Sequence, residues 1–141
     1  MSGATTGDAL AEAALAFAGT RFRLHGRTRE TGLDCVGLLD AALRGIGAAP
    51  HLPNGYPLRS LTQPDVETWM HASGFVPAEA PRQPGDVLIL RPAPTQVHVA
   101  IALAPQRIVH AHAGLRKVVV TPLPDPWPVL SRWRLLPPSL T

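Results

Sequence analysis

The stretch TGLDCVGLL, residues 31–39, decides how this chain folds and what chemistry it can carry. It places the only cysteine, Cys35, directly after Asp34 and at the head of an apolar run. Aspartate is a preferred helix N-cap, and the apolar residues that follow recur at helical spacing. We therefore predict a helix that begins at Asp34 and stops at Gly45 or Gly47. The open question is whether Cys35 is a buried filler or a nucleophile.

The composition describes a globular chain of 141 residues, which fits one domain over residues 1–141. A hydrophobic content of 45% with 16% charged residues excludes a disordered chain. No apolar run is long enough to span a membrane. The N-terminus has no basic residues before its apolar part, which predicts that there is no secretory signal peptide. A single cysteine excludes an intramolecular disulfide, and the net charge of +3 is compatible with an acidic substrate.

Hydrophobic periodicity predicts helices early in the chain and strands later. The Ala-rich run 8–18 predicts an amphipathic helix capped by Thr6 or Asp8 and ended by Gly19. Residues 20–29 alternate basic and apolar residues, which predicts an extended segment with one basic face. The other predicted elements are a loop at 48–61, a helix at 64–72 and strands at 87–90, 96–103, 107–112, 117–121 and 129–135. This order predicts an α+β fold, with the helices on one side of an antiparallel sheet of about five strands.

The Pro-rich C-terminal segment, residues 122–141, has two interpretations. It closes the sheet, or it docks to a partner protein. Trp127 and Trp133 are suitable anchors in either case.

Two histidines lie on neighbouring predicted strands, and their odd or even positions decide which face of each strand they occupy. In the strand at 96–103 the large apolar residues share one face, and His98 shares the other face with alanines. On the next strand His110 has the same parity as His112. The short connection between the strands predicts a hairpin, which brings His98 and His110 together as neighbours.

These residues supply the parts of a nucleophilic site. The helix dipole favours a thiolate at Cys35, whereas the charge of Asp34 opposes it unless backbone N–H groups occupy the carboxylate. A neighbouring imidazole can take the thiol proton, and a third polar group can hold that imidazole in one tautomer. Cys35, His98 and His110 fit these roles, with His112 as the alternative third member. The structural alternative is a buried cysteine beside satisfied sheet histidines.

Five short motifs follow one another along the chain: GTRFRLHG (19–26), GLDCVG (32–37), QPGDVL (83–88), HVAI (98–101) and IVHA (108–111). In this order they resemble the NlpC-type cell-wall cysteine peptidases, over roughly residues 8–121. Within that family the chain is most similar to short peptidases encoded beside tail genes in phages and gene-transfer agents.

The resemblance implies a papain-like α+β fold and cleavage of peptidoglycan stem peptides next to D-glutamate and diaminopimelate. It implies that Cys35 is the nucleophile, His98 the general base and His110 the orienting residue, with the backbone N–H of Cys35 as an oxyanion donor. No cofactor is expected. It also implies a cytoplasmic product that reaches the cell wall or periplasm with a phage-like tail, in contact with tail or baseplate proteins.

The expected substrate-binding residues are Asp34, Phe22, Arg21 and Tyr56. Asp34 has a second interpretation besides the cap, as the group that binds the ammonium of a stem peptide. Phe22 stands where the family usually has tyrosine, and Tyr56, the only tyrosine, is the obvious substitute. Val36 stands where serine is common in the family, so the resemblance does not fix the substrate preference.

The basic stretch 21–29, which contains Arg21, is a solvated face, a lining for a carboxylate-rich peptide or a docking surface for a partner. Nucleic-acid binding is not expected, because a single aromatic residue interleaves with the basic ones and no motif is present. A metal site is not expected either, since His110 and His112 are the only close pair of ligand residues. Two rival functions stay open: a structural tail or baseplate protein with this fold, and an amidase or acyltransferase that uses the same cysteine.

Overall fold

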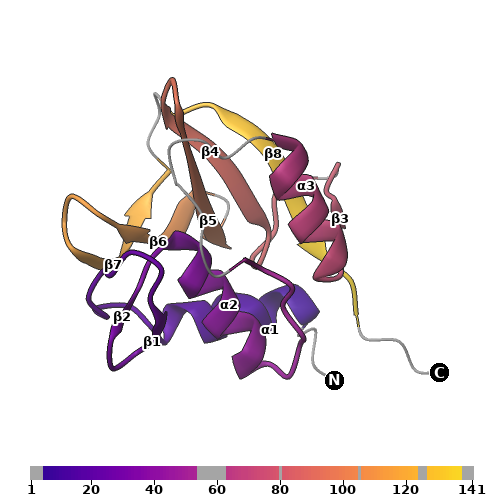
Figure 1. The fold of residues 1–141 in the computed structure, drawn as a ribbon. Coiled ribbons are helices and arrows are strands. Elements are labelled where there is room, and N and C mark those ends of the chain that lie inside the picture. Colours follow the sequence, from indigo (N-terminus) through magenta and orange to yellow (C-terminus); the bar gives the residue numbers. More distant parts are fainter. Residues whose placement is uncertain (1–4, 54–62, 80, 105, 124–126, 138–141) are drawn as a thin grey trace.

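The computed structural model describes residues 5–53, 63–79, 81–104, 106–123 and 127–137, and Figure 1 shows its fold. The elements are, in chain order, α1 (Thr6–Leu15), β1 (Arg27–Thr28), β2 (Gly32–Leu33), α2 (Cys35–Gly45), α3 (Gln63–Ala72), β3 (Phe75–Pro77), β4 (Val87–Ala93), β5 (Gln96–Ala104), β6 (Arg107–His112), β7 (Lys117–Pro122) and β8 (Val129–Leu135). This is the predicted α+β order. None of the helices in the described ranges is long and apolar enough to cross a membrane.

Six strands form one antiparallel sheet in the order β3–β8–β4–β5–β6–β7, and β1 and β2 pair separately. The prediction of about five strands missed β3, a three-residue edge strand on β8, because three residues carry no measurable alternation. Strand β8 lies between β3 and β4, so residues 129–135 of the Pro-rich segment are part of the sheet.

The first helix differs from the prediction at both ends. Its N-cap is Thr5, whose hydroxyl accepts the N–H of Asp8, while the Asp8 carboxylate accepts the N–H of Thr5. This reciprocal capping box places both predicted caps inside the helix. The helix ends at Leu15 rather than continuing to residue 18, because the chain turns away and the N–H of Gly19 donates to the carbonyl of Val118 on β7.

The segment 20–29 is not one extended strand, although Arg21, Arg23 and Arg29 are exposed. It contains β1 and isolated bridges at its start, and His25 has a positive φ of 61° that breaks the alternation. The cause is Asp34, whose Oδ2 accepts the N–H of His25 at 2.7 Å and turns the chain. Arg27 also leaves the basic face: it forms an ion pair with Asp40 of α2 at 3.3 Å and donates to the carbonyl of Pro53.

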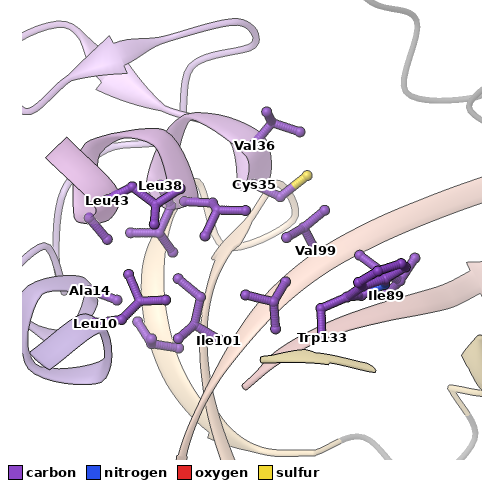
Figure 2. Packing of buried hydrophobic residues seen from close by; sticks show 14 of the residues in the cluster. Leu10, Ala14, Cys35, Val36, Leu38, Leu43, Ile89, Val99, Ile101 and Trp133 are labelled. Atoms are coloured by element: carbon purple, nitrogen blue, oxygen red, sulfur yellow. The ribbon is translucent and has the colours of Figure 1, made fainter. Parts of the chain in front are cut away.

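The main core lies between α1, α2 and one face of the sheet (Figures 1 and 2). Its buried members include Leu10, Ala14, Leu38, Leu43, Ile89, Val99, Ile101 and Trp133. A smaller cluster covers the opposite face of the sheet and contains Leu88, Leu90, Ala100 and Ile108. The predicted alternation along 96–103 is therefore confirmed, with the valines and Ile101 toward the helices.

Asp86 ties β8 to the start of β4. Its carboxylate accepts the N–H of Gln83 at 2.9 Å. It also binds the guanidinium groups of Arg132 and Arg134, both on β8, at 2.8–2.9 Å. Burial raises the pKa of Asp86, but the hydrogen bonds from Arg134, Gln83 and Arg132 outweigh it, so the net pKa lies below its usual value.

Gly37 makes the first turn of α2 possible. A Cβ at this position would overlap the carbonyl oxygen of Gly26, whose backbone passes directly over the helix. Gly45, at the other end of the same helix, has open space, with the Ala13 methyl at an ordinary 3.8 Å. The loop before β1 therefore packs on α2 through two glycines, one from each element.

Replacing Gly37 with alanine forces the loop and the helix apart, and we expect a loss of about 1–3 kcal/mol in the free energy of unfolding. The Gly45→Ala variant is the matched control on the same helix, and we expect its stability to be unchanged or slightly raised. Thermal and urea denaturation of the two variants measure this difference. Equal stabilities for both would show that the close approach of Gly26 is not needed.

Candidate active site

Cys35 is the first residue of α2 and is held there by the cap before it. Asp34 is the N-cap, as predicted, and its Oδ1 accepts the N–H of Gly37 at 2.7 Å. Its Oδ2 accepts the N–H of His25, so both carboxylate oxygens have backbone partners. Cys35 itself is buried, with 3% of its surface exposed. Figure 2 shows it at the edge of the core, beside Val99.

The thiol of Cys35 lies against the backbone of β5, beyond the registered pairs of that strand with β6. The registered pairs of β5 and β6 run from Ala104–Arg107 to Ile101–Val109. Beyond them the backbone N–H of Val99 donates to the sulfur of Cys35. The thiol of Cys35 and the ring of His98 line the same cavity, which is described below.

The two predicted histidines contact each other. His98 on β5 and His110 on β6 are joined by an Nε2–Nδ1 hydrogen bond of 2.9 Å, and both side chains are buried. Their predicted proximity is therefore confirmed. The Nε2 of His110 lies 3.0 Å from the hydroxyl of Thr121 on β7. An ordered chain of polar groups thus crosses three strands.

His112 does not take the place of His110. Its Nδ1 accepts the N–H of Leu115 in the β6–β7 turn at 3.0 Å, and its ring stands edge-on to His110 at 5.6 Å between centroids. The structure therefore pairs His98 with His110 and leaves His112 on the wall of the cavity described next.

A cavity of about 160 Å³ contains the thiol and the first histidine. Its walls come from the loop after α1, the start of α2, strands β4 to β6, the β6–β7 turn and the segment before β8; the residues are Phe22, Cys35, Pro92, Gln96, Val97, His98, Ala111, His112, Ala113, Gly114 and Trp127. Trp127 stands edge-on to both imidazoles, 5.6 Å from His98 and 6.0 Å from His110 between ring centroids. It covers the histidine pair on the face opposite the helices.

Burial keeps Cys35, His98 and His110 neutral. Desolvation, followed by the charge of Asp34, raises the pKa of the Cys35 thiol to about 12, against the opposing effect of the backbone N–H groups of Val99, Val36 and Cys35. Desolvation, with the proximity of His110 and His112, lowers the pKa of His98 to about 3. Desolvation also lowers the pKa of His110 to about 4. The site therefore rests as a thiol beside neutral imidazoles.

This electrostatic state corrects the expectation of a helix-dipole thiolate. The carboxylate of Asp34 is occupied by backbone N–H groups, as the sequence argument required, yet its charge still raises the pKa of Cys35. Burial is the larger cause, because the chain packs the thiol into the core rather than at an open helix end.

Of the four predicted substrate-binding residues, the structure places Phe22 at the cavity. Phe22 lines the cavity, whereas Arg21 is exposed and does not line it. Asp34 is fully buried, and its carboxylate does not line the cavity. Tyr56 lies outside the described residues. No cluster of three or more His, Cys, Asp or Glu side chains able to hold a metal ion occurs in the ranges that the structure describes.

Sequence reasoning gave Thr121 no role and treated Trp127 as a sheet or docking anchor. A signal for Thr121 exists: it is the hydroxyl residue in KVVVTP, two positions beyond Val119, which pairs with His110. Residues two apart share a face of a strand, so Thr121 was a candidate once β6 and β7 were taken as a hairpin. Trp127 had no such signal, because it precedes β8 in an irregular segment.

Several solved structures resemble this fold. NlpC1 from Trichomonas vaginalis superposes with a TM-score of 0.70 at 19% identity, covering 95% of this chain and 46% of that one. The peptidoglycan hydrolase RipB from Mycobacterium tuberculosis gives 0.61 at 22% identity, covering 93% and 65%. RipD from the same organism, a non-catalytic NlpC/p60 domain protein adapted to peptidoglycan binding, gives 0.61 at 21%, covering 94% and 99%.

No protein-family model matches the sequence, and no curated protein does. This chain spans about half the length of the Trichomonas protein. The superpositions establish that the chain has the NlpC/P60 fold, as the ordered motifs predicted.

The pKa directions make a testable prediction about protonation. An imidazole with a lowered pKa is neutral at any pH above that value. A thiol with a raised pKa stays protonated at any pH below that value. From about pH 5 to about pH 9, we expect the ring ¹⁵N signals of His98 and His110 not to titrate. Over the same range the thiolate absorbance of the wild type should equal that of Cys35→Ser. A histidine midpoint near pH ~6.5, or a thiolate at neutral pH, would refute the neutral site.

Proposed function

We propose that this protein is a cysteine peptidase that hydrolyses peptidoglycan stem peptides through Cys35, His98 and His110. The observation that carries the proposal is that the thiol of Cys35 and the imidazole of His98 line one cavity, with His98 hydrogen-bonded to His110 behind it. Its fold is shared with RipB, a peptidoglycan hydrolase, which supports the substrate class. The bond next to D-glutamate and diaminopimelate is the proposed cleavage site.

In the proposed mechanism each of these residues has its own step. The Nε2 of His98 is engaged by His110, so Nδ1 is the nitrogen that takes the thiol proton as the sulfur of Cys35 attacks the stem-peptide carbonyl. The backbone N–H of Cys35 is the proposed donor to the oxyanion of the tetrahedral intermediate. His98 then returns the proton to the leaving amine. Water, activated by the same imidazole, hydrolyses the thioester and restores the thiol.

The neutral resting state suits this general-base route. A thiol that keeps its proton needs a neutral imidazole beside it, and His98 is neutral throughout the physiological range. The proton moves only as the sulfur attacks, so charge forms in the transition state, inside a site that Trp127 shields from water.

Phe22 is the proposed contact for the stem peptide, because it lines the cavity that holds the thiol. Without a hydroxyl it supplies an apolar surface rather than a hydrogen bond. Arg21 is exposed and would bind a carboxylate of the stem peptide outside the cavity. The tail-associated setting is a further proposal, and assaying purified tail particles for this protein tests it.

A binding role without catalysis is the second candidate. Two observations favour it: RipD has the same fold and is non-catalytic, and the thiol of this chain is buried with its pKa raised to about 12. In this alternative the cavity recognises the stem peptide and Cys35 is a core residue.

Incubation with muropeptides of known composition, with products identified by mass, separates the two candidates. We expect the wild type to cleave under reducing conditions and Cys35→Ala to lose at least about 10³-fold in rate, because no other thiol is present. His98→Ala should lose a similar factor. The product masses also show which amide bond breaks, which distinguishes a peptidase from an amidase.

The matched control is binding of both variants to intact sacculi. Cys35→Ala should bind as the wild type does, which shows that the lost activity is not lost folding. Absence of turnover by the wild type on every muropeptide, with binding retained, would favour the non-catalytic role. Activity retained in Cys35→Ala would show that the proposed mechanism is wrong.

A further inference from the structure

The hydrogen-bonded residues of the site include a fourth, Thr121, to which the Cys-His-His assignment gives no role. Thr121 lies on β7 directly across from Ile108 of β6, and its hydroxyl is 3.0 Å from Nε2 of His110. The other nitrogen of that ring contacts His98 at 2.9 Å. Both nitrogens of His110 are therefore engaged, and its ring has one position that satisfies both neighbours.

The direction of hydrogen-bond donation from His98 through His110 to Thr121 follows from what the groups at the two ends must do. A neutral imidazole carries one N–H, so if Nδ1 of His98 is to accept the thiol proton, its Nε2 must donate to His110. Nδ1 of His110 then accepts, and its Nε2–H must find an acceptor of its own. The hydroxyl of Thr121 is that acceptor. The reverse direction would place an N–H of His98 toward the thiol, where it could not act as a base.

Removal of the hydroxyl weakens the arrangement in two ways. The Nε2–H of His110 would lack its acceptor in a largely buried setting, which costs free energy and loosens the ring. The imidazolium that forms on His98 during catalysis would also lose support, since each donor in a chain of hydrogen bonds strengthens the next.

We propose that Thr121 is a positioning residue, whose hydroxyl fixes the orientation and tautomer of His110 and through it keeps Nδ1 of His98 ready to accept the proton of Cys35. This role rests on the proposed function of the Cys35–His98 pair. Thr121 does not line the cavity, so it acts through His110 and not on the substrate.

The test compares Thr121→Val, which keeps the shape and β-branching without the hydroxyl, with Thr121→Ser, which keeps the hydroxyl. Since Cys35 is the only cysteine, its alkylation by iodoacetamide at neutral pH, followed by intact mass, reports the reactivity of the site without any peptidoglycan substrate. We expect about a tenfold lower alkylation rate for Thr121→Val and a rate within about threefold of wild type for Thr121→Ser.

Ring ¹⁵N spectra supply the readout that a purely structural role would not move. In the wild type and Thr121→Ser, both His98 and His110 should carry the proton on Nε2. In Thr121→Val, a population of His110 protonated on Nδ1 should appear. A Thr121→Val protein that alkylates at the wild-type rate with unchanged ring signals would overturn the proposal.

Two outcomes keep this inference separate from the proposed function. If His98→Ala alkylates as fast as wild type, the thiol and imidazole are not coupled, and the proposed catalytic mechanism fails together with the role of Thr121. If His98→Ala slows alkylation and Thr121→Val does not, the coupling stands and the role of Thr121 alone is overturned.

Discussion

The carboxylate of Asp34 is the interaction on which the rest of the site depends. One oxygen accepts the N–H of Gly37 and fixes the first residue of α2, and the other accepts the N–H of His25 and turns the preceding loop. That loop carries Phe22 to the cavity wall, while the helix start carries Cys35. The two walls are thus set by one buried side chain. The close approach that results explains why the first turn of α2 needs a glycine.

The same carboxylate imposes an electrostatic cost on the thiol. Its charge adds to desolvation in raising the pKa of Cys35, so the cap that places this thiol at the helix start also keeps it protonated. The proposed mechanism needs an imidazole that is neutral at physiological pH beside such a thiol, and burial keeps His98 neutral. The two perturbations, opposite in direction for the acid and the base, have a common origin in the dry interior of the site.

The sequence predicted the elements that have strong periodicity or a clear cap. Helix α2, strands β6 and β8, and the shared face of His98 and His110 follow from apolar spacing and parity, and the structure contains them. It could not predict the register of β5 on β6, which shifts between Ala102 and Ala104, because register depends on packing that the local sequence does not show. Burial of Cys35 stayed an open alternative for the same reason, because burial is a property of packing that the local motif does not show.

The C-terminal segment shows how remote parts of the chain complete the site. Asp86 at the start of β4 binds Arg132 and Arg134 and so anchors β8 beside β4. Trp127 lies just before β8, and this anchoring brings its ring to the edges of His98 and His110. An ion-pair cluster at one end of the sheet therefore helps to keep water from the imidazoles at the other. Because burial sets the pKa values of both histidines, the sheet order contributes to the chemistry as directly as the residues of the cavity do.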